Sequence, residues 1–344
     1  MTLDPIELND GRKIPSIAFG TGSALFRRDA VQYVVQAIYT GLSHIDTAQQ
    51  YENESSTGTA LKETGVARND VWITTKYHSP GGTGPRSALL ESLKKLGVKF
   101  VDLYLIHHPS SVSDIPRTWS EMEDTVKEGL TKSIGVSNFT VEHLELLMKH
   151  TRITPAVNQI NFSPYQLHKM LPVLKYCQKH GIFIEAYGSL APITKQSGGP
   201  VDVPVKKAAE RLKATPAQVL FLWVRQKGCV IVTTSSKRER LEEYLAIGDL
   251  ESLTAEEIHA IDDAGMKGSA LFALDPLIRG RLGQLQLLLL TLSFIALSWY
   301  TVAHQYGTMG LFQDTLTIFV WTSSLFTLVL QTCRFYIRLR TTIK

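Results

Sequence analysis

Cysteine is scarce in this sequence: Cys177, Cys229 and Cys333 are the three among 344 residues, and they lie far apart. Their spacing matches neither a metal-ligand cluster nor a disulfide framework, so we expect no metal site and a reducing compartment. Internal repeats are absent, and glycine and proline are modest at 24 and 14 residues. These features exclude collagen-like, disordered and solenoid proteins and leave one large or two ordinary globular domains.

A strong excess of charge of one sign is also missing. The 36 Lys and Arg residues face 32 Asp and Glu residues, which gives a formal net charge of +4. Where charges are dense they alternate in sign, as in 206–213 and 237–243. Such alternation is typical of solvated helix faces rather than of a phosphate-binding stripe, so we expect no nucleic-acid partner. The first ten residues lack a basic segment followed by an apolar one, so no secretory signal peptide is expected.

Basic residues disappear from one long segment near the C-terminus. Between 282 and 333 there is no Lys or Arg, and Asp314 is the only acidic residue. Two apolar blocks, 282–302 and 316–333, are separated by a polar link at 303–315. Each block has about the length that an α-helix needs to cross the ~30 Å hydrocarbon core of a membrane. We therefore predict a transmembrane helical hairpin. Helices buried in a soluble fold, or a foreign tail fused by an erroneous gene model, are the alternatives.

Basic residues on both sides of the two blocks predict the orientation of this hairpin. Arg279 and Arg281 precede it within a linker at 271–281, and a basic tail at 334–344 follows it. The polar link between the blocks has no Lys or Arg. The positive-inside rule therefore places both ends of the hairpin, and the N-terminal domain, in the cytosol. Without a signal peptide, the default membrane is that of the endoplasmic reticulum.

Short, continuously apolar runs alternate with amphipathic helical patterns between residues 15 and 245. The predicted strands are 17–21, 44–48, 71–76, 101–107, 133–137, 156–161, 183–187 and 230–234. The predicted helices are 29–40, 54–64, 85–96, 116–127, 141–150, 168–180, 216–226 and 237–245. Apolar runs of this kind are typical of parallel strands buried on both faces.

Eight strands in alternation with eight helices predict an α/β fold, a (β/α)₈ TIM barrel over 1–270. Residues 6–14 predict an N-terminal β-hairpin with an Asn-Asp-Gly turn, which would close one end of the barrel. A doubly wound open sheet is the alternative. However, the segment 20–25 after the first strand lacks the third glycine of a dinucleotide-binding fingerprint.

Polar side chains follow three neighbouring predicted strands, at the end where such a barrel carries its chemistry. Asp46 and then Tyr51 follow the second strand, Lys76 ends the third, and His107 ends the fourth. A buried Lys needs a partner, and Asp46 is the nearest one. A neighbouring ammonium lowers the pKa of a phenol from about 10 toward neutrality, so Tyr51 would become a workable acid/base. His107 can hold a carbonyl oxygen in line, and His108 would line the wall. A structural ion pair and a core histidine are the alternative interpretations.

Five blocks of sequence resemble signatures of the aldo-keto reductase family. They are HIDTAQQYENE at 44–54, TKY at 75–77, DLYLIHHP at 102–109, IGVSNF at 134–139 and VNQ at 157–159. Their order and spacing match the family from residue 6 to about 268, which covers the predicted barrel but not the tail. The resemblance implies an NADPH-dependent carbonyl reductase. Such an enzyme reversibly converts an aldehyde or ketone to an alcohol with a hydride from the nicotinamide C4.

The resemblance also implies a role for each matching residue. Tyr51 would donate the proton, Lys76 with its ion-pair partner Asp46 would tune Tyr51, and His107 would orient the carbonyl. The residues expected to bind the cofactor are Ser137, Asn138 and Gln159 at the carboxamide, Tyr187 stacked on the nicotinamide ring, Ser189 and Leu190 beside the pyrophosphate, and also Thr21 and Glu243.

Departures from the family pattern bear on the cofactor and the substrate. A Lys-Ser pair often follows the last strand, but Thr233 and Thr234 stand here. Hydroxyls, a helix N-terminus and Arg240 can still receive a 2′-phosphate, with Lys237 as compensation. NADPH is therefore expected, with NADH as the alternative.

Two tryptophans and a C-terminal loop that are common in the family are missing. Gly22 and His108 occupy the tryptophan positions, which predicts a wider substrate pocket. Without the long substrate loop, the bilayer surface could cover an apolar carbonyl substrate. We expect a monomeric soluble domain. A regulatory, redox-sensing subunit that binds the cofactor beside a membrane partner is the alternative function.

Overall fold

The computed structural model describes residues 3–78 and 82–268. The chain divides into two compact units, one of residues 1–197 and 201–266 and one of 198–200 and 267–344. The first unit holds every strand and helix described below. The predicted linker at 271–281, the two predicted spans, their link and the basic tail lie outside the described residues. Within the described residues, no helix combines the length and the apolarity needed to cross a membrane.

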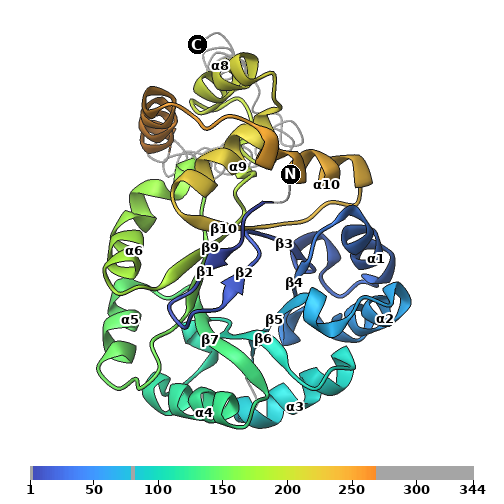
Figure 1. Ribbon diagram of the computed structural model, residues 1–344. Helices are drawn as coiled ribbons and strands as arrows, with labels where there is room; N and C mark the ends of the chain where they lie inside the picture. Colours follow the sequence, from blue (N-terminus) through green and yellow to red (C-terminus); the bar gives the residue numbers. More distant parts are fainter. Residues whose placement is uncertain (1–2, 79–81, 269–344) are drawn as a thin grey trace, which may run out of the picture. The chain divides into compact units, whose positions relative to one another are not determined.

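Eight parallel strands form a closed barrel in which each strand pairs with its neighbours in the chain and β10 pairs with β3 (Figure 1). The strands are β3 (Ile17–Gly20), β4 (His44–Asp46), β5 (Trp72–Tyr77), β6 (Val101–Ile106), β7 (Thr131–Ser137), β8 (Val157–Asn161), β9 (Phe183–Tyr187) and β10 (Cys229–Thr233). The predicted (β/α)₈ barrel is therefore confirmed. Four of its strands, β3, β4, β6 and β8, are one or two residues shorter than predicted, so that β4 ends at Asp46 and His107 lies just after β6.

Helices surround the barrel and cover the outer faces of its strands (Figure 1). They are α1 (Val31–Thr40), α2 (Glu54–Thr64), α3 (Pro85–Leu96), α4 (Ile115–Lys127), α5 (Val141–Met148), α6 (Leu167–Lys179), α7 (Ala191–Thr194), α8 (Asp202–Leu212), α9 (Pro216–Gln226) and α10 (Arg238–Leu245). A further helix begins at residue 255. The N-terminus of α9 follows the predicted pattern, since Thr215 accepts a hydrogen bond from the Gln218 amide in a capping box.

Helices α7 and α8, between β9 and α9, break the strict alternation that the sequence predicts. In α8 the buried side chains are Val205, Ala208 and Ala209. Lys206, Lys207, Glu210 and Arg211 of this helix are exposed. The alternating charges at 206–213 predicted a solvated helix face, but the segment was not among the eight predicted helices.

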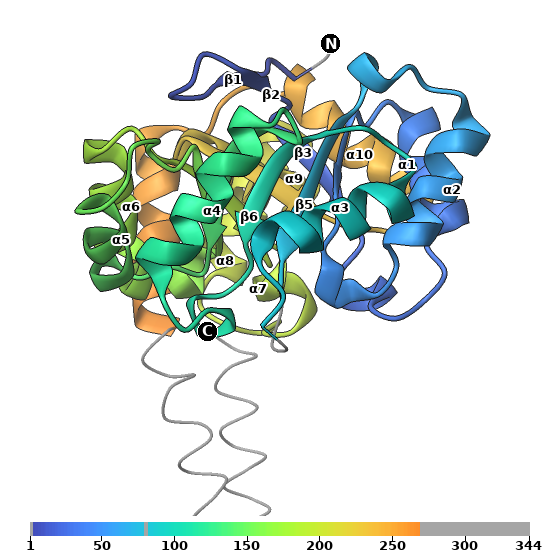
Figure 2. The same cartoon turned by 90° about the horizontal axis from the view of Figure 1, so that it is seen from below.

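The N-terminal hairpin, β1 (Ile6–Glu7) and β2 (Lys13–Ile14), pairs antiparallel as predicted. It lies over one end of the barrel, and α7 lies at the opposite end (Figure 2). Leu8 and Ile14 pack there with Trp72, Leu103 and other apolar side chains of the barrel interior. This plug of apolar side chains excludes water from the N-terminal end and leaves polar chemistry to the C-terminal end.

Candidate active site

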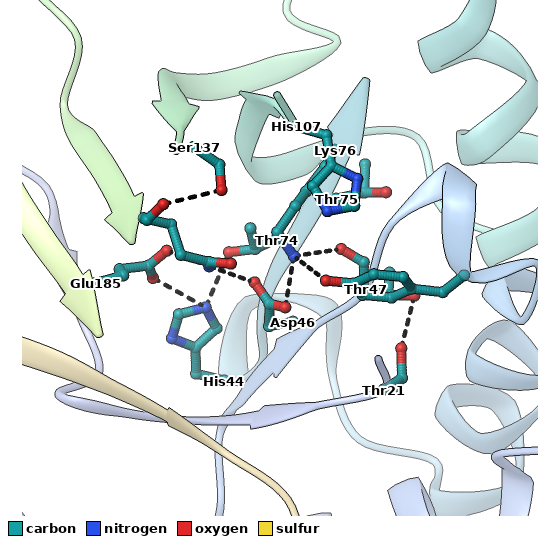
Figure 3. A network of polar contacts seen from close by, with 12 residues as sticks. Thr21, His44, Asp46, Thr47, Thr74, Thr75, Lys76, His107, Ser137 and Glu185 are labelled. Carbon is teal, nitrogen blue, oxygen red and sulfur yellow. Dashed lines mark hydrogen bonds and ion pairs between the residues drawn. The ribbon is translucent and has the colours of Figure 1, made fainter. Parts of the chain in front are cut away.

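Four polar side chains from three consecutive βα connections meet inside the C-terminal end of the barrel (Figure 3). Asp46 is the last residue of β4, and Lys76 lies near the end of β5. Tyr51 closes a short 3₁₀ turn, Gln49–Tyr51, in the loop between β4 and α2. His107 directly follows β6. These are the four residues that the sequence predicts to act together.

Lys76 is the centre of this group. Its ammonium nitrogen donates to Asp46 Oδ1 at 2.5 Å, to the Thr47 carbonyl at 2.9 Å and to the Tyr51 hydroxyl oxygen at 3.3 Å. The side chain is fully buried, and burial alone would lower its pKa. The Asp46 carboxylate outweighs burial, so the pKa of Lys76 is raised and the ammonium stays charged. All three N–H donors are used, which fixes the ammonium against the Tyr51 oxygen.

The pKa of Tyr51 differs from the sequence-based expectation. Lys76 does lower it, but burial of the phenol raises it by more, and the net pKa lies above its usual value of 10. The expectation of a phenol pKa near neutrality is therefore wrong. Because the Tyr51 oxygen accepts from Lys76, its own O–H is left to donate elsewhere. The arrangement holds a neutral phenol ready to give up a proton.

His107 stands edge-on to the Tyr51 ring, with ring centroids 5.4 Å apart. Burial, followed by the Lys76 charge, lowers its pKa to about 2, so the imidazole is neutral at any working pH. His108 stacks on His107 with ring centroids 4.7 Å apart and is half-buried, and its ring makes no hydrogen bond to the described residues. His78 lies 6.2 Å from His107, again edge-on.

The residues predicted to bind the nicotinamide carboxamide or ring lie in β7, β8 and β9 or just after them, with Gln159 in the middle of β8. The Ser137 hydroxyl donates to the Gln159 carbonyl at 2.9 Å, and the Asn138 amide donates to the His107 carbonyl at 3.0 Å. The half-buried Tyr187 donates its hydroxyl to Asn138 Oδ1 at 2.8 Å. Asn138 adopts a left-handed conformation (φ 63°) that turns its side chain back toward the site.

Six other residues predicted to bind the cofactor lie just after β9, at the end of β10 or beside α10. Ser189 is buried and Leu190 half-buried just after β9, while Thr233 and Thr234 are half-buried at the end of β10. Lys237 and Arg240 are exposed beside the N-terminus of α10, which no side chain caps. These six residues follow neighbouring strands, as expected of one binding surface.

The side chains of the last two predicted cofactor residues, Thr21 and Glu243, form hydrogen bonds with other residues of the protein. The buried Thr21 hydroxyl lies 2.9 Å from Thr47 Oγ1 and 3.1 Å from Asn53 Oδ1, and it donates its single proton to one of these two oxygens. Asn53, which the sequence reasoning did not single out, also donates to the Thr21 and Leu25 carbonyls. These bonds hold the loop that carries Tyr51. Glu243 accepts from the Thr215 hydroxyl at 2.5 Å and so supports the start of α9.

Gly22 leaves the space that the Tyr51 ring occupies. A Cβ atom at this position would lie 2.8 Å from Tyr51 Cζ and 3.1–3.2 Å from the two adjacent ring carbons. A tryptophan, common here in related sequences, would require Tyr51 to move.

Replacing Gly22 by alanine is therefore expected to lower kcat by about 10²-fold, because a displacement of about 1 Å at a catalytic group costs that much. The backbone of Gly22 (φ −77°) suits alanine, so the fold should remain intact by circular dichroism. In a Tyr51→Phe background the same change should have little further effect on kcat. A full additional loss in that background would place the defect elsewhere.

The sequence and the fold both match known proteins. The model of the aldo/keto reductase family matches residues 16–265. The chain belongs to this family. An NAD/NADP-dependent indole-3-acetaldehyde reductase of Schizosaccharomyces pombe is 39% identical over 269 residues, which cover 75% of this chain and 93% of the relative. An NADPH-dependent alpha-keto amide reductase of Saccharomyces cerevisiae is 37% identical over 287 residues, covering 77% and 91%. The crystal structure of a Bombyx mori aldo-keto reductase in complex with NADP has a TM-score of 0.69 at 30% identity, covering 76% and 93%.

Family membership confirms the resemblance inferred from the five sequence blocks, all of which lie within the matched region. Glu185, which none of the five blocks contains, also belongs to the buried polar group. A glutamate within the apolar strand 183–187 was the signal that could have identified it, because a buried carboxyl needs a partner.

Proposed function

We propose that this chain reduces aldehydes and ketones to alcohols with NADPH, and that Tyr51 donates the proton. The observation that carries this proposal is the contact of one buried ammonium, Lys76, with both the Asp46 carboxylate and the Tyr51 hydroxyl. A positive charge at that point stabilises the phenolate that forms when Tyr51 gives up its proton. Asp46 keeps the ammonium charged and in place. The reaction is reversible, because the same phenolate can take a proton from an alcohol.

His107 is proposed to orient the substrate. Its low pKa makes it a neutral donor, so it can hydrogen-bond a carbonyl oxygen without competing with Tyr51 for the proton. Together with Tyr51, it would hold the carbonyl oxygen in the position at which it receives the Tyr51 proton.

The residues on the opposite wall fit a nicotinamide dinucleotide. Asn138 offers an amide at the carboxamide position, and the half-buried Tyr187 offers an aromatic face. The uncapped N-terminus of α10 and the exposed Lys237 and Arg240 can receive a phosphate. When bound, the cofactor supplies the hydride. Both named relatives use NADP or NADPH, and we propose NADPH with NADH as the second cofactor.

The substrate is proposed to carry a second oxygen next to the reacting carbonyl, as an alpha-keto amide does. His108 supports this proposal, because its ring is stacked on His107 and has no hydrogen bond to the described residues. Two adjacent imidazoles can each bind one of two neighbouring oxygens. One relative is named for alpha-keto amide reduction.

The location of the chain is a further proposal that rests on sequence alone. Residues 282–302 and 316–333 are proposed to anchor it to the endoplasmic reticulum membrane with the barrel, a monomer, in the cytosol. The apolar blocks without Lys or Arg support this. Extraction of the full chain from membranes by alkaline carbonate would contradict it, whereas release only by detergent is the expected result.

Cofactor oxidation by the purified full chain tests the proposed function. NADPH and NADH are compared over aromatic and aliphatic aldehydes, a simple ketone and an alpha-keto amide. Turnover with NADPH is expected, and His108→Ala should lower kcat/KM more for the keto amide than for the simple ketone, by about 10-fold for one lost hydrogen bond. Cofactor binding without turnover on any carbonyl would instead favour the regulatory subunit.

A further inference from the structure

Glu185 is a carboxyl group in the middle of the barrel that the proposed mechanism leaves without a role. It lies in β9, is fully buried, and its neighbours in the strand are the buried Ile184 and Ala186. A carboxylate in such surroundings is costly unless it is neutral or paired. Its presence therefore calls for a compensating contact or a function.

The contact is the side-chain amide of Gln159. Its nitrogen donates to Asp46 Oδ2 at 2.8 Å and to Glu185 Oε2 at 2.8 Å. An amide nitrogen has two N–H donors, so both are used. The amide nitrogen is thus held between two carboxyl groups, which fixes the orientation of the whole amide. Asp46 accepts from this amide and also from Lys76, with which it pairs in Figure 3, and Lys76 in turn donates to Tyr51.

The electrostatic surroundings of Glu185 come from β4 and β5. Among the described residues, the titratable groups that face or act on it are His44, Asp46, Lys76 and, in the loop after β4, Tyr51. His44 Nε2 lies 3.9 Å from Glu185 Oε1, and this oxygen has no hydrogen-bond partner among the described residues. Burial, and then the Asp46 charge, raise the pKa of Glu185 to about 8. Burial lowers the pKa of His44 to about 4. At pH 7 both groups are therefore neutral, and Glu185 gains its charge as the pH rises through about 8.

We propose that Glu185 is a positioning residue of this active site. Through Gln159 it fixes the orientation of a side-chain amide that is proposed to bind the cofactor, and it controls the charge behind Asp46, Lys76 and Tyr51. This inference rests on the proposed function. When Glu185 ionises, a second negative charge stands behind Asp46 and makes Tyr51 a poorer proton donor, because it disfavours the phenolate.

Two substitutions separate the two parts of this role. Glu185→Gln keeps an acceptor for Gln159 but cannot ionise. At pH 7 it should retain more activity than Glu185→Ala. It should also abolish the three- to tenfold fall in reductive kcat/KM that the charge on Glu185 is expected to cause in the wild type between pH 7 and 9. Glu185→Ala removes the acceptor and should weaken NADPH binding by about 3- to 10-fold in a fluorescence titration, which needs no turnover. Rescue of binding in Glu185→Gln relative to Glu185→Ala is the sign of positioning.

Glu123→Gln is the matched control. Glu123 is also a buried glutamate, but it bonds to Arg152 and Ile153 outside the site. The inference would be overturned if Glu123→Gln caused changes equal to those of the Glu185 variants. It would also be overturned if wild type and both Glu185 variants had the same pH profiles and the same NADPH dissociation constants. If Glu185→Ala fails to fold, the pH profile of Glu185→Gln still decides. A wild-type chain that binds NADPH without turnover would refute the proposed function, while the binding titrations would still test the Gln159 contact.

Discussion

Tyr51→Phe is expected to lower kcat for carbonyl reduction by about 10²–10⁴-fold, the contribution of a positioned general acid. The phenyl ring should keep its place against His107, and NADPH binding should change little. Stopped-flow measurement of a single turnover, with NADPH binding followed separately by fluorescence, would check both parts. The variant removes a single oxygen atom, and with it both the transferable proton and the acceptor of the Lys76 hydrogen bond.

Tyr104→Phe is the control for this experiment. Tyr104 is also buried and donates its hydroxyl to the Pro85 carbonyl at 3.0 Å, away from the site. Its loss should cost about 1 kcal/mol of stability and leave kcat near wild type. If Tyr51→Phe retained more than a tenth of the activity, another group would have to supply the proton.

Lys76→Met should remove both activity and stability. The substitution leaves the Asp46 carboxylate, only 1% exposed, without its counter-charge. Breaking a buried pair in this way costs about 3–5 kcal/mol. Urea unfolding should show this loss in the free energy of unfolding, and kcat should fall with it because nothing then stabilises the Tyr51 phenolate.

The double variant Asp46→Asn, Lys76→Met separates the two effects. With both charges removed, much of the stability should return, since an uncharged pair leaves no unpaired buried ion. The activity should not return. Lys227→Met is a useful comparison, because Lys227 pairs with Asp262 at 2.6 Å but both side chains are partly exposed, at 21% and 17%. A comparable cost there would argue against burial as the cause.

Most of the barrel and of the catalytic group could be predicted from the sequence, because both depend on local patterns. Apolar runs identified the strands, and a polar residue at the end of an apolar strand identified Asp46, Lys76 and His107. The parallel topology then placed them together. Tyr51 lies in a loop, where no periodic pattern places a residue. Its position shortly after Asp46 made it a candidate acid/base, and the family resemblance then gave it the role of proton donor.

Contacts across the barrel interior could not be predicted in the same way. The bond from Gln159 to Asp46 joins strands on different parts of the barrel wall, and no spacing in the sequence encodes it. The prediction for the pKa of Tyr51 was wrong for a related reason. A nearby charge can be inferred from the sequence, but the amount of burial that opposes it depends on the packed structure.

The Gln159 bond also has a consequence for the order in which the protein is made. Asp46 and Lys76 are separated by 30 residues, whereas Gln159 follows Asp46 by 113. A chain emerging from the ribosome can therefore form the ion pair long before the amide that completes it has been synthesised. Until β8 and β9 pair with the earlier strands, Asp46 Oδ2 lacks its hydrogen bond from Gln159. The unfinished barrel is therefore expected to be less stable than the complete one. Catalytic activity then reports that the second half of the chain has assembled onto the first, so two separately expressed halves would provide a direct readout of that assembly.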